Sequence, residues 1–223
     1  MPTVLITGCD HGIGREFACQ YAQEGWEVIA TYRDPENRID ALSGSVHASL
    51  DVTDEAQFTA LKAEIGERPI DLIISNAGIG LDTGRLGSLD FSYVRQMYEV
   101  NTIGPLRLIE CFADNLKAGE MRRFIAITSR MGSISLNLSG GHYGYRASKA
   151  GLNAMVRSLA IDLFSHGITV TALHPGWVDT AGGGGNAAVP VAESVQEMRM
   201  VISRLGNHDT GQLYDYKGVP LPW

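Results

Sequence analysis

The chain has 223 residues, a length that suits one large α/β domain better than two small ones. Hydrophobic residues make up 44% of it and charged residues 19%, which is ordinary for a globular protein that buries its own core. The formal net charge of −7 argues against general binding to nucleic acid, because nucleic-acid-binding proteins usually carry a basic surface.

Short apolar runs alternate along the chain with longer segments of helical periodicity. In chain order these predict a strand over Thr3–Thr7, a helix over Ile13–Gln23, strands over Glu27–Tyr32 and Val46–Leu50, a helix from the Asp54 cap to about Ile65, a strand over Ile70–Ser75, a helix over Phe91–Leu116, a strand over Arg123–Thr128, a helix over Tyr145–Ser165, a strand over Ile168–His174, a helix over Pro190–Arg204 and an edge strand over Gly211–Tyr216. Pro105 should bend or split the helix that contains it. Nearly continuous Val/Ile/Leu strands separated by helices predict one doubly wound Rossmann domain over residues 1–223, with a parallel sheet of about seven strands covered on both faces.

A glycine-rich turn, TGCDHGIG (Thr7–Gly14), separates the first predicted strand from the first predicted helix. Gly8 permits a tight turn, Gly12 lets the backbone approach a pyrophosphate, and Gly14 allows the helix to pack closely on the strand. The N–H groups at the start of the helix are suited to bind the phosphates. A glycine-rich turn without a ligand is the alternative, and the motifs that follow argue against it.

Two tyrosines lie just before a predicted helix in the stretch GGHYGYRASKAGLNAM. Lys149 follows Tyr145 by four residues and therefore shares its helix face, whereas Ala147 holds the equivalent position after Tyr143. An ammonium group ~6 Å away, at an effective dielectric of 20, would favour the phenolate by roughly 2.8 kcal/mol, or about two pKa units. We therefore expect Tyr145 to be an acid/base and Lys149 to supply the charge, with an exposed surface pair as the alternative.

The order of these motifs resembles the short-chain dehydrogenase/reductase family along essentially the whole chain, and within it the sniffer/C-factor group of small carbonyl reductases. The glycine turn has the family's T-G-x-x-x-G-x-G spacing. The other matching motifs are SNAG (Ser75–Gly78), VN (Val100–Asn101), TS (Thr128–Ser129), Tyr145-x-x-x-Lys149 and HPGWVDT (His174–Thr180), with DYKGVPLPW at the end.

The resemblance implies a catalytic tetrad made of Asn101, Ser129, Tyr145 and Lys149. Ser129 would hydrogen-bond the substrate oxygen, with Ser133 and Ser135 as rivals in the same loop. Lys149 would bind the nicotinamide ribose, and Asn101 would open its helix locally and hold a water that bonds to Lys149. His174 is expected to pack or hydrogen-bond rather than to act as an acid or base.

The resemblance also implies a nicotinamide dinucleotide as cofactor. Arg33, nineteen residues beyond Gly14, and His11 in the glycine turn favour NADP, because a basic side chain suits a 2′-phosphate. Asp34 leaves NAD as an alternative, since an acidic residue there would bind the ribose 2′-hydroxyl.

The same resemblance implies that Asp51, together with the backbone of Val52, holds the adenine amino group. A turn aspartate that caps the next helix is the alternative for Asp51, although Asp54 is better placed for that cap. Asn76 would brace the sheet. The complete set of expected cofactor-binding residues is Gly8, Asp10, His11, Gly12, Ile13, Gly14, Arg33, Asp51, Val52, Asn76, Ala77, Gly78, Tyr145, Lys149, Pro175, Gly176, Val178 and Thr180.

The expected substrate is a small carbonyl compound or alcohol. Four consecutive glycines, Gly182–Gly185, predict a mobile, open rim that accepts many substrates. Candidate wall residues are Leu81, Met131, Leu136, His142, Tyr143 and Trp177.

The leading hypothesis is an NADP-dependent carbonyl reductase. An NAD(P)-binding signalling or regulatory protein of C-factor type, and a 3-oxoacyl-acyl carrier protein reductase, remain as alternatives; the second of these would need a basic docking patch. The resemblance implies a homodimer or homotetramer, with the apolar VPLPW at 219–223 as a candidate for burial against a neighbouring subunit.

The three cysteines show neither a metal-ligand spacing nor a disulfide pattern, so we expect no metal site. The first strand begins without a preceding signal-peptide pattern, and no apolar run approaches the ~20 residues of a membrane span. A cytoplasmic location without a membrane span is therefore expected.

Overall fold

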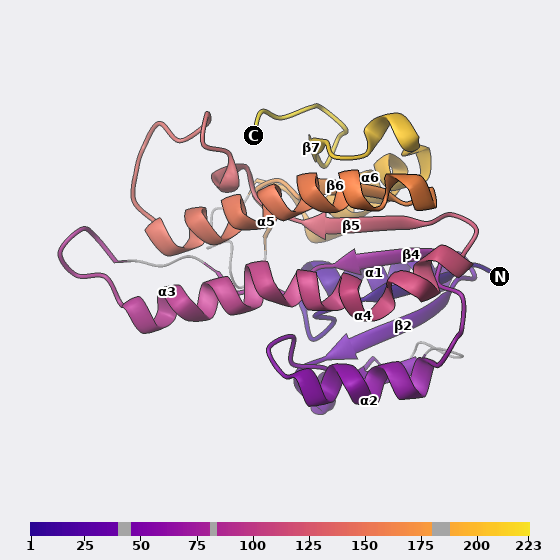
Figure 1. Cartoon of the computed structure of the whole chain (residues 1–223). Coiled ribbons are helices and arrows are strands. Elements are labelled where there is room, and N and C mark those ends of the chain that lie inside the picture. The colour runs from indigo at the N-terminus through magenta and orange to yellow at the C-terminus, as the bar shows by residue number, and fades with distance from the viewer. Residues whose placement is uncertain (40–45, 81–83, 180–187) are drawn as a thin grey trace.

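A parallel, seven-stranded sheet with the strand order β3-β2-β1-β4-β5-β6-β7 runs through the molecule (Figure 1). The structure is a computed structural model and describes residues 1–39, 46–80, 84–179 and 188–223. The strands are β1 (Thr3–Ile6), β2 (Glu27–Tyr32), β3 (Val46–Ser49), β4 (Leu72–Ser75), β5 (Arg123–Ile127), β6 (Thr169–His174) and β7 (Leu213–Asp215). The predicted doubly wound α/β fold is confirmed, because the strand order reverses direction after β1.

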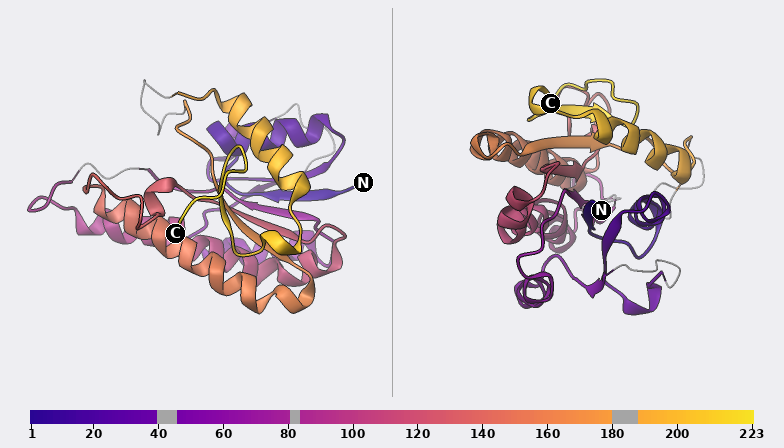
Figure 2. Two further views of the ribbon diagram at one scale, coloured as in Figure 1. Left: turned by 90° about the horizontal axis from the view of Figure 1, so that it is seen from above. Right: turned by 90° about the vertical axis from the view of Figure 1, so that its right-hand side faces the viewer.

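Helices cover both faces of this sheet, as the two views in Figure 2 show. They are α1 (Gly12–Gln23), α2 (Glu55–Ile65), α3 (Phe91–Tyr98), α4 (Gly104–Ala118), α5 (Tyr143–Asp162) and α6 (Val191–Arg204). Val4 and Ile6 of β1 pack in one apolar cluster with α1 and α6, whereas Leu5 between them packs in a second cluster with α2, α4 and α5. Since alternate side chains of a strand point to opposite faces, an uninterrupted apolar run is what a strand buried on both sides requires.

The helical segment over 91–118 is split, as Pro105 predicts. A π-helical turn, Glu99–Ile103, separates α3 from α4, and Pro105 is the second residue of α4. Proline has no N–H to donate, and its ring clashes with the carbonyl four residues earlier, so the regular α-helical hydrogen bonding fails before it. That carbonyl belongs to Asn101, which lies in the middle of the π-helical turn.

Residues 220–223 fold back on their own chain. Pro220 pairs antiparallel with Tyr214 of β7, and the N–H of Leu221 donates to Leu213 O at 2.8 Å. The Trp223 side chain packs against the apolar cluster on the α5 side of the sheet. The edge of β7 thus offers this segment backbone partners within the chain, and its burial against a neighbouring subunit stays a prediction.

Within the described ranges, none of the helices combines the length and the apolar character needed to cross a bilayer.

Candidate active site

A cavity of about 1500 Å³ opens at the edge of the sheet where the parallel strands end. The residues that line it follow β1, β2, β3, β4, β5 and β6, together with residues from α3, α5 and the segment after β7. Ligand sites for drug-sized molecules occupy roughly 300–1,000 Å³. This cavity therefore has room for a dinucleotide and a small molecule side by side.

The glycine turn closes one end of the cavity. A Cβ on Gly14 would lie 2.2 Å from the carbonyl oxygen of Gly8, so only glycine fits where α1 meets β1. Gly8 itself has a φ of +72°, a left-handed conformation that side chains disfavour. His11 precedes α1 in an extended conformation, and in the described chain no side chain caps this helix N-terminus. Its first N–H groups are thus available to an anion in the cavity.

The chain after β4 is fastened to this turn. Asn76 Nδ2 donates to the carbonyl oxygens of Thr7 and Gly8 at 3.0 and 3.1 Å. The Thr7 hydroxyl accepts from the N–H groups of Asn76 and Ala77, both at 3.1 Å. Asn76 braces the sheet as expected, and it holds Ala77 and Gly78 against the cavity.

A second turn, after β2, lies beside the glycine turn. Both carboxylate oxygens of Asp10 accept backbone N–H groups, from Arg33 at 3.1 Å and from Asp34 at 2.8 Å. Asp34 Oδ1 accepts the N–H of Glu36 at 3.0 Å, so this carboxylate is partly engaged in shaping the turn. Asp10 thereby holds Arg33, an exposed cation, at the wall of the cavity.

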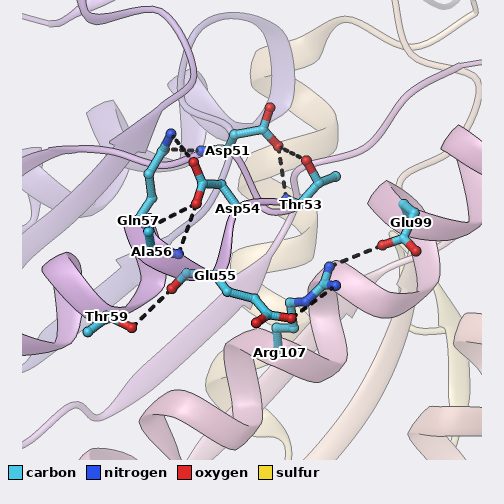
Figure 3. A network of polar contacts seen from close by, with 9 residues as sticks. All are labelled: Asp51, Thr53, Asp54, Glu55, Ala56, Gln57, Thr59, Glu99 and Arg107. Atoms are coloured by element: carbon cyan, nitrogen blue, oxygen red, sulfur yellow. Dashed lines mark hydrogen bonds and ion pairs between the residues drawn. The ribbon is translucent and has the colours of Figure 1, made fainter.

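Asp51 is less free than its sequence context suggests. Asp54 caps α2 as expected and accepts from the N–H groups of Ala56 and Gln57 at 2.9 and 3.3 Å. However, Asp51 Oδ1 accepts both the N–H and the hydroxyl of Thr53, at 2.9 and 2.7 Å (Figure 3). Such a local turn is a common use of aspartate, and it leaves only the second oxygen of Asp51 to face a ligand. Asp51 and Val52 both line the cavity.

Ser129, Tyr145 and Lys149 meet in this cavity, which all three side chains line. Ser129 follows β5, is buried, and accepts the N–H of Met131 at 3.1 Å while it hydrogen-bonds with Tyr145. Lys149 is only 5% exposed, and its Nζ donates to Ile127 O at 3.0 Å. A Cβ on Gly132 would lie 2.7 Å from the backbone of Lys149, so the loop after β5 packs directly on α5. The shared helix face that the i, i+4 spacing predicts is therefore the face that lines the site.

The pKa of Tyr145 is shifted in the direction opposite to the expected one. Burial raises the pKa of Tyr145, and the hydrogen bond with Ser129 offsets part of that rise. Burial also lowers the pKa of Lys149 to about 8. The lowering of the Tyr145 pKa by about two units is not found, because desolvation of the phenolate dominates at this site.

Asn101 lies next to the same group, fully buried in the π-helical turn. Its Oδ1 accepts the N–H of Ile79 at 2.8 Å, and its Nδ2 donates to Ile79 O and to Ser148 Oγ, both at 3.1 Å. Asn101 thus joins the chain after β4 to α5 at the residue that precedes Lys149. A Cβ on Gly78 would lie 3.2 Å from Asn101 Oδ1 and 3.6 Å from Lys149 Nζ, which shows how near the two polar groups are.

The loop after β6 forms the far wall of the cavity. Pro175, Gly176 and Val178 line it, and a Cβ on Gly176 would lie 3.1 Å from the ring of Tyr216. His174 lines it as well, but burial lowers the pKa of its imidazole to about 4, which leaves the ring neutral near pH 7.

Of the wall residues that the sequence suggests, Met131 and Trp177 line the cavity. Leu136, His142 and Tyr143 do not, and Tyr143 begins α5 with 44% of its surface exposed. Leu81, Thr180 and the glycine run lie outside the described residues.

Sequence reasoning missed several lining residues, among them Arg130, Asp215, Tyr216 and Leu221. The apolar VPLPW was the available signal for Leu221, but it was assigned to a subunit interface.

The chain is similar to known proteins in both sequence and structure. The family model described as short chain dehydrogenase matches residues 2–188. The C-signal protein of Myxococcus xanthus is 41% identical over 155 residues, which are 70% of this chain and 93% of that protein. The crystal structure of NADPH-bound carbonyl reductase from chicken fatty liver superposes with a TM-score of 0.88 at 31% identity and covers 100% of this chain and 99% of the other. The carbonyl reductase Sniffer of D. melanogaster covers 100% of both chains, with a TM-score of 0.89 and 28% identity.

Proposed function

The chain belongs to the short-chain dehydrogenase/reductase family, and on that premise we propose that it reduces aldehydes or ketones to alcohols with NADPH. The observation that carries the proposal is the meeting of Ser129, Tyr145 and Lys149 in one cavity with the glycine turn. Ser129 and Tyr145 are hydrogen-bonded to each other, so both can reach one bound carbonyl oxygen.

The residues at the nucleotide end fit such a cofactor. The α1 N-terminus, which no described side chain caps, suits the pyrophosphate. Arg33 suits a 2′-phosphate, while the carboxylate of Asp34, the feature that favours NAD, is partly occupied by the N–H of Glu36. A bound NADPH supplies the hydride; the remaining tasks fall to the protein.

At the chemical end, the phenol of Tyr145 donates its proton to the carbonyl oxygen as that oxygen gains negative charge. Burial raises the pKa of this phenol, so Tyr145 is protonated and ready to act as an acid near neutral pH. Lys149, with a pKa of about 8, remains mostly an ammonium at pH 7 and stabilises the phenolate that forms. Ser129 donates a hydrogen bond to the same carbonyl oxygen and orients it.

A panel of aldehydes, ketones and quinones, assayed with NADPH and NADH in parallel, tests this proposal. Tyr145→Phe should abolish turnover and leave the Kd for NADPH nearly unchanged, because the ring remains and only the acid is lost. Tyr143→Phe is the matched control: it removes a hydroxyl two residues away, on a half-exposed ring that does not line the cavity. If Tyr145→Phe turns over as fast as Tyr143→Phe, the assignment is wrong.

The likeness to the C-signal protein favours a second candidate, an NAD(P)-binding signalling or regulatory protein. Wild-type protein that binds NADPH tightly yet reduces no member of the panel would support this candidate over the first. Thioesters of 3-oxoacyl groups belong in the same panel. A strong preference for carrier-protein thioesters over small-molecule ones would instead favour a 3-oxoacyl-acyl carrier protein reductase.

Exposed apolar side chains on and beside the long helices support a homodimer or homotetramer. They are Tyr98, Leu106, Ile161 and Phe164, between 38% and 68% exposed. Light scattering coupled to size-exclusion chromatography tests the assembly. We further propose that residues 1–223 form one domain, which predicts a single calorimetric unfolding transition.

A further inference from the structure

The segment over residues 220–223, called here the returning segment, is held firmly beside β7. The carboxylate of Asp215 accepts the N–H groups of Lys217 and Val219 at 2.9 and 2.8 Å, and the N–H of Asp215 donates to Val219 O at 2.9 Å. This tight turn reverses the chain. The bond from Leu221 N to Leu213 O then continues the antiparallel pairing.

The end of the returning segment is bound by the loop between β5 and α5. The backbone oxygen of Trp223 accepts three hydrogen bonds, from Ser133 Oγ at 3.1 Å, Ser135 Oγ at 3.1 Å and Ser135 N at 3.3 Å. Ser133 is almost fully buried. Three donors from one short loop on a single oxygen make a specific attachment rather than an incidental contact.

The same loop is fastened on its other side by α5. Arg146 donates to Gly141 O at 3.2 Å and to Ser139 Oγ at 3.0 Å. Gly132 packs against the backbone of Lys149. The loop that begins with Ser129 is therefore held between α5 and the returning segment.

The returning segment also reaches the cavity. Leu221 lines it, as does Tyr216 from the turn before the segment, on the same cavity that Ser129 and Met131 line. The ring of Tyr216 packs against Gly176, where an added Cβ would lie 3.1 Å from it. Leu221 and Tyr216 therefore contribute apolar surface to the pocket that Ser129 and Met131 also line.

We propose that the returning segment determines substrate specificity: Leu221 forms a fixed apolar wall that contacts the carbonyl substrate, and Trp223 holds Ser133 and Ser135 so that the Ser129 loop keeps its place. The proposal rests on the carbonyl reductase function proposed above. The chemical class it selects is an aldehyde or ketone with an extended apolar group beside the carbonyl. In such a pocket one methylene group changes kcat/KM by roughly 10- to 200-fold.

Leu221→Ala tests the wall, with a homologous series of increasing chain length built on the best substrate of the panel. We expect the ratio of kcat/KM for long over short members to rise by about tenfold or more, since the space left by Leu221 accepts additional carbons. Val219→Ala is the matched control, because its side chain is 54% exposed and does not line the cavity. Leu221→Phe should shift the ratio in the opposite direction, and melting temperatures verify that each variant is folded.

The double variant Ser133→Ala/Ser135→Ala tests the attachment without any need for turnover. Amide hydrogen exchange over residues 130–139 should accelerate by roughly tenfold, because two of the three bonds to Trp223 O are lost. Leu136 is left out of this comparison, because its N–H also donates to Ser133 Oγ at 3.3 Å. Ser203→Ala on α6, whose hydroxyl bonds only within its own helix in the described structure, should leave this exchange unchanged. In the double variant kcat should fall while the KM for NADPH stays constant.

The outcomes separate this inference from the function on which it rests. If Tyr145→Phe is inactive but Leu221→Ala has the same kcat/KM ratio for long over short substrates as Val219→Ala, the proposed function stands. The proposal that Leu221 forms a wall of the substrate pocket is then wrong. Unchanged exchange in the double variant overturns the attachment. If no carbonyl is reduced, the proposed function and the specificity role fail together, and the exchange measurement alone decides whether the segment holds the loop.

Discussion

Replacing Asn101 with alanine should both destabilise the protein and slow its reaction. The side chain makes three hydrogen bonds in a fully buried position, two with the backbone of Ile79 and one with the hydroxyl of Ser148. A hydrogen bond contributes about 1 kcal/mol net, and a buried donor left without a partner costs about 1–3 kcal/mol more. The expected loss in the free energy of unfolding is therefore about 4 kcal/mol, or roughly 8–16 °C in Tm for a chain of this size.

Asn115→Ala provides the matched control. This residue is also almost fully buried, and its amide donates to Gly66 O and Arg68 O at 2.9 and 2.8 Å while accepting from Lys62. It lies at the far end of α4 and does not line the cavity. We expect a similar fall in Tm with little change in kcat.

The two variants should differ in turnover. The Asn101 side chain joins Ile79, in the chain after β4, to Ser148, the residue before Lys149. Its loss should displace Lys149, and a displacement of 1 Å of a group in a site can lower the rate about 100-fold. We expect kcat for carbonyl reduction at 25 °C to fall at least about tenfold below that of the Asn115 variant. Melting curves and steady-state kinetics on both proteins measure this. Equal kcat values, or an Asn101→Ala protein that melts at the wild-type temperature, would refute the reasoning.

Three further predictions follow from the site. Gly14→Ala should lower the Tm and weaken NADPH binding in titrations, because its Cβ would overlap the backbone of the preceding turn, whereas Gly206→Ala, with open space around it, should be neutral. Lys149 has a pKa of about 8 in the folded protein and an ordinary pKa of 10.5, so between these values the unfolded chain binds more protons and stability rises with pH. Lys149→Met should flatten that rise in denaturation series from pH 8 to 9.5, and an unaltered slope would contradict the assigned burial. Arg33→Ala should raise the KM for NADPH about tenfold or more and barely change that for NADH, while Arg38→Ala, which does not line the cavity, should change neither.

Much of the fold follows from local sequence patterns. The runs that became β1, β2, β4, β5 and β6 are mainly apolar, with the buried Thr31 and Thr171 as interior exceptions, because helices cover both faces of the sheet. The break near Pro105 follows from the chemistry of one residue, although the sequence alone did not place it at the π-helical turn around Asn101. Element ends shifted by a few residues, as at α5, which starts at Tyr143 rather than Tyr145.

The sequence by itself determined that Tyr145 and Lys149 share a helix face and that a glycine turn precedes the first helix, because the i, i+4 spacing and the glycine spacing are local properties of the backbone. Only the tertiary structure decided the pKa shifts of these groups and which residues line the cavity around them. Burial, and not the neighbouring ammonium, sets the direction of the Tyr145 pKa shift. Leu221 and Tyr216 reach the cavity through a chain reversal after β7, and Tyr143 does not line it. Desolvation and contacts between distant segments depend on how the whole chain packs, and no short stretch of sequence encodes that packing.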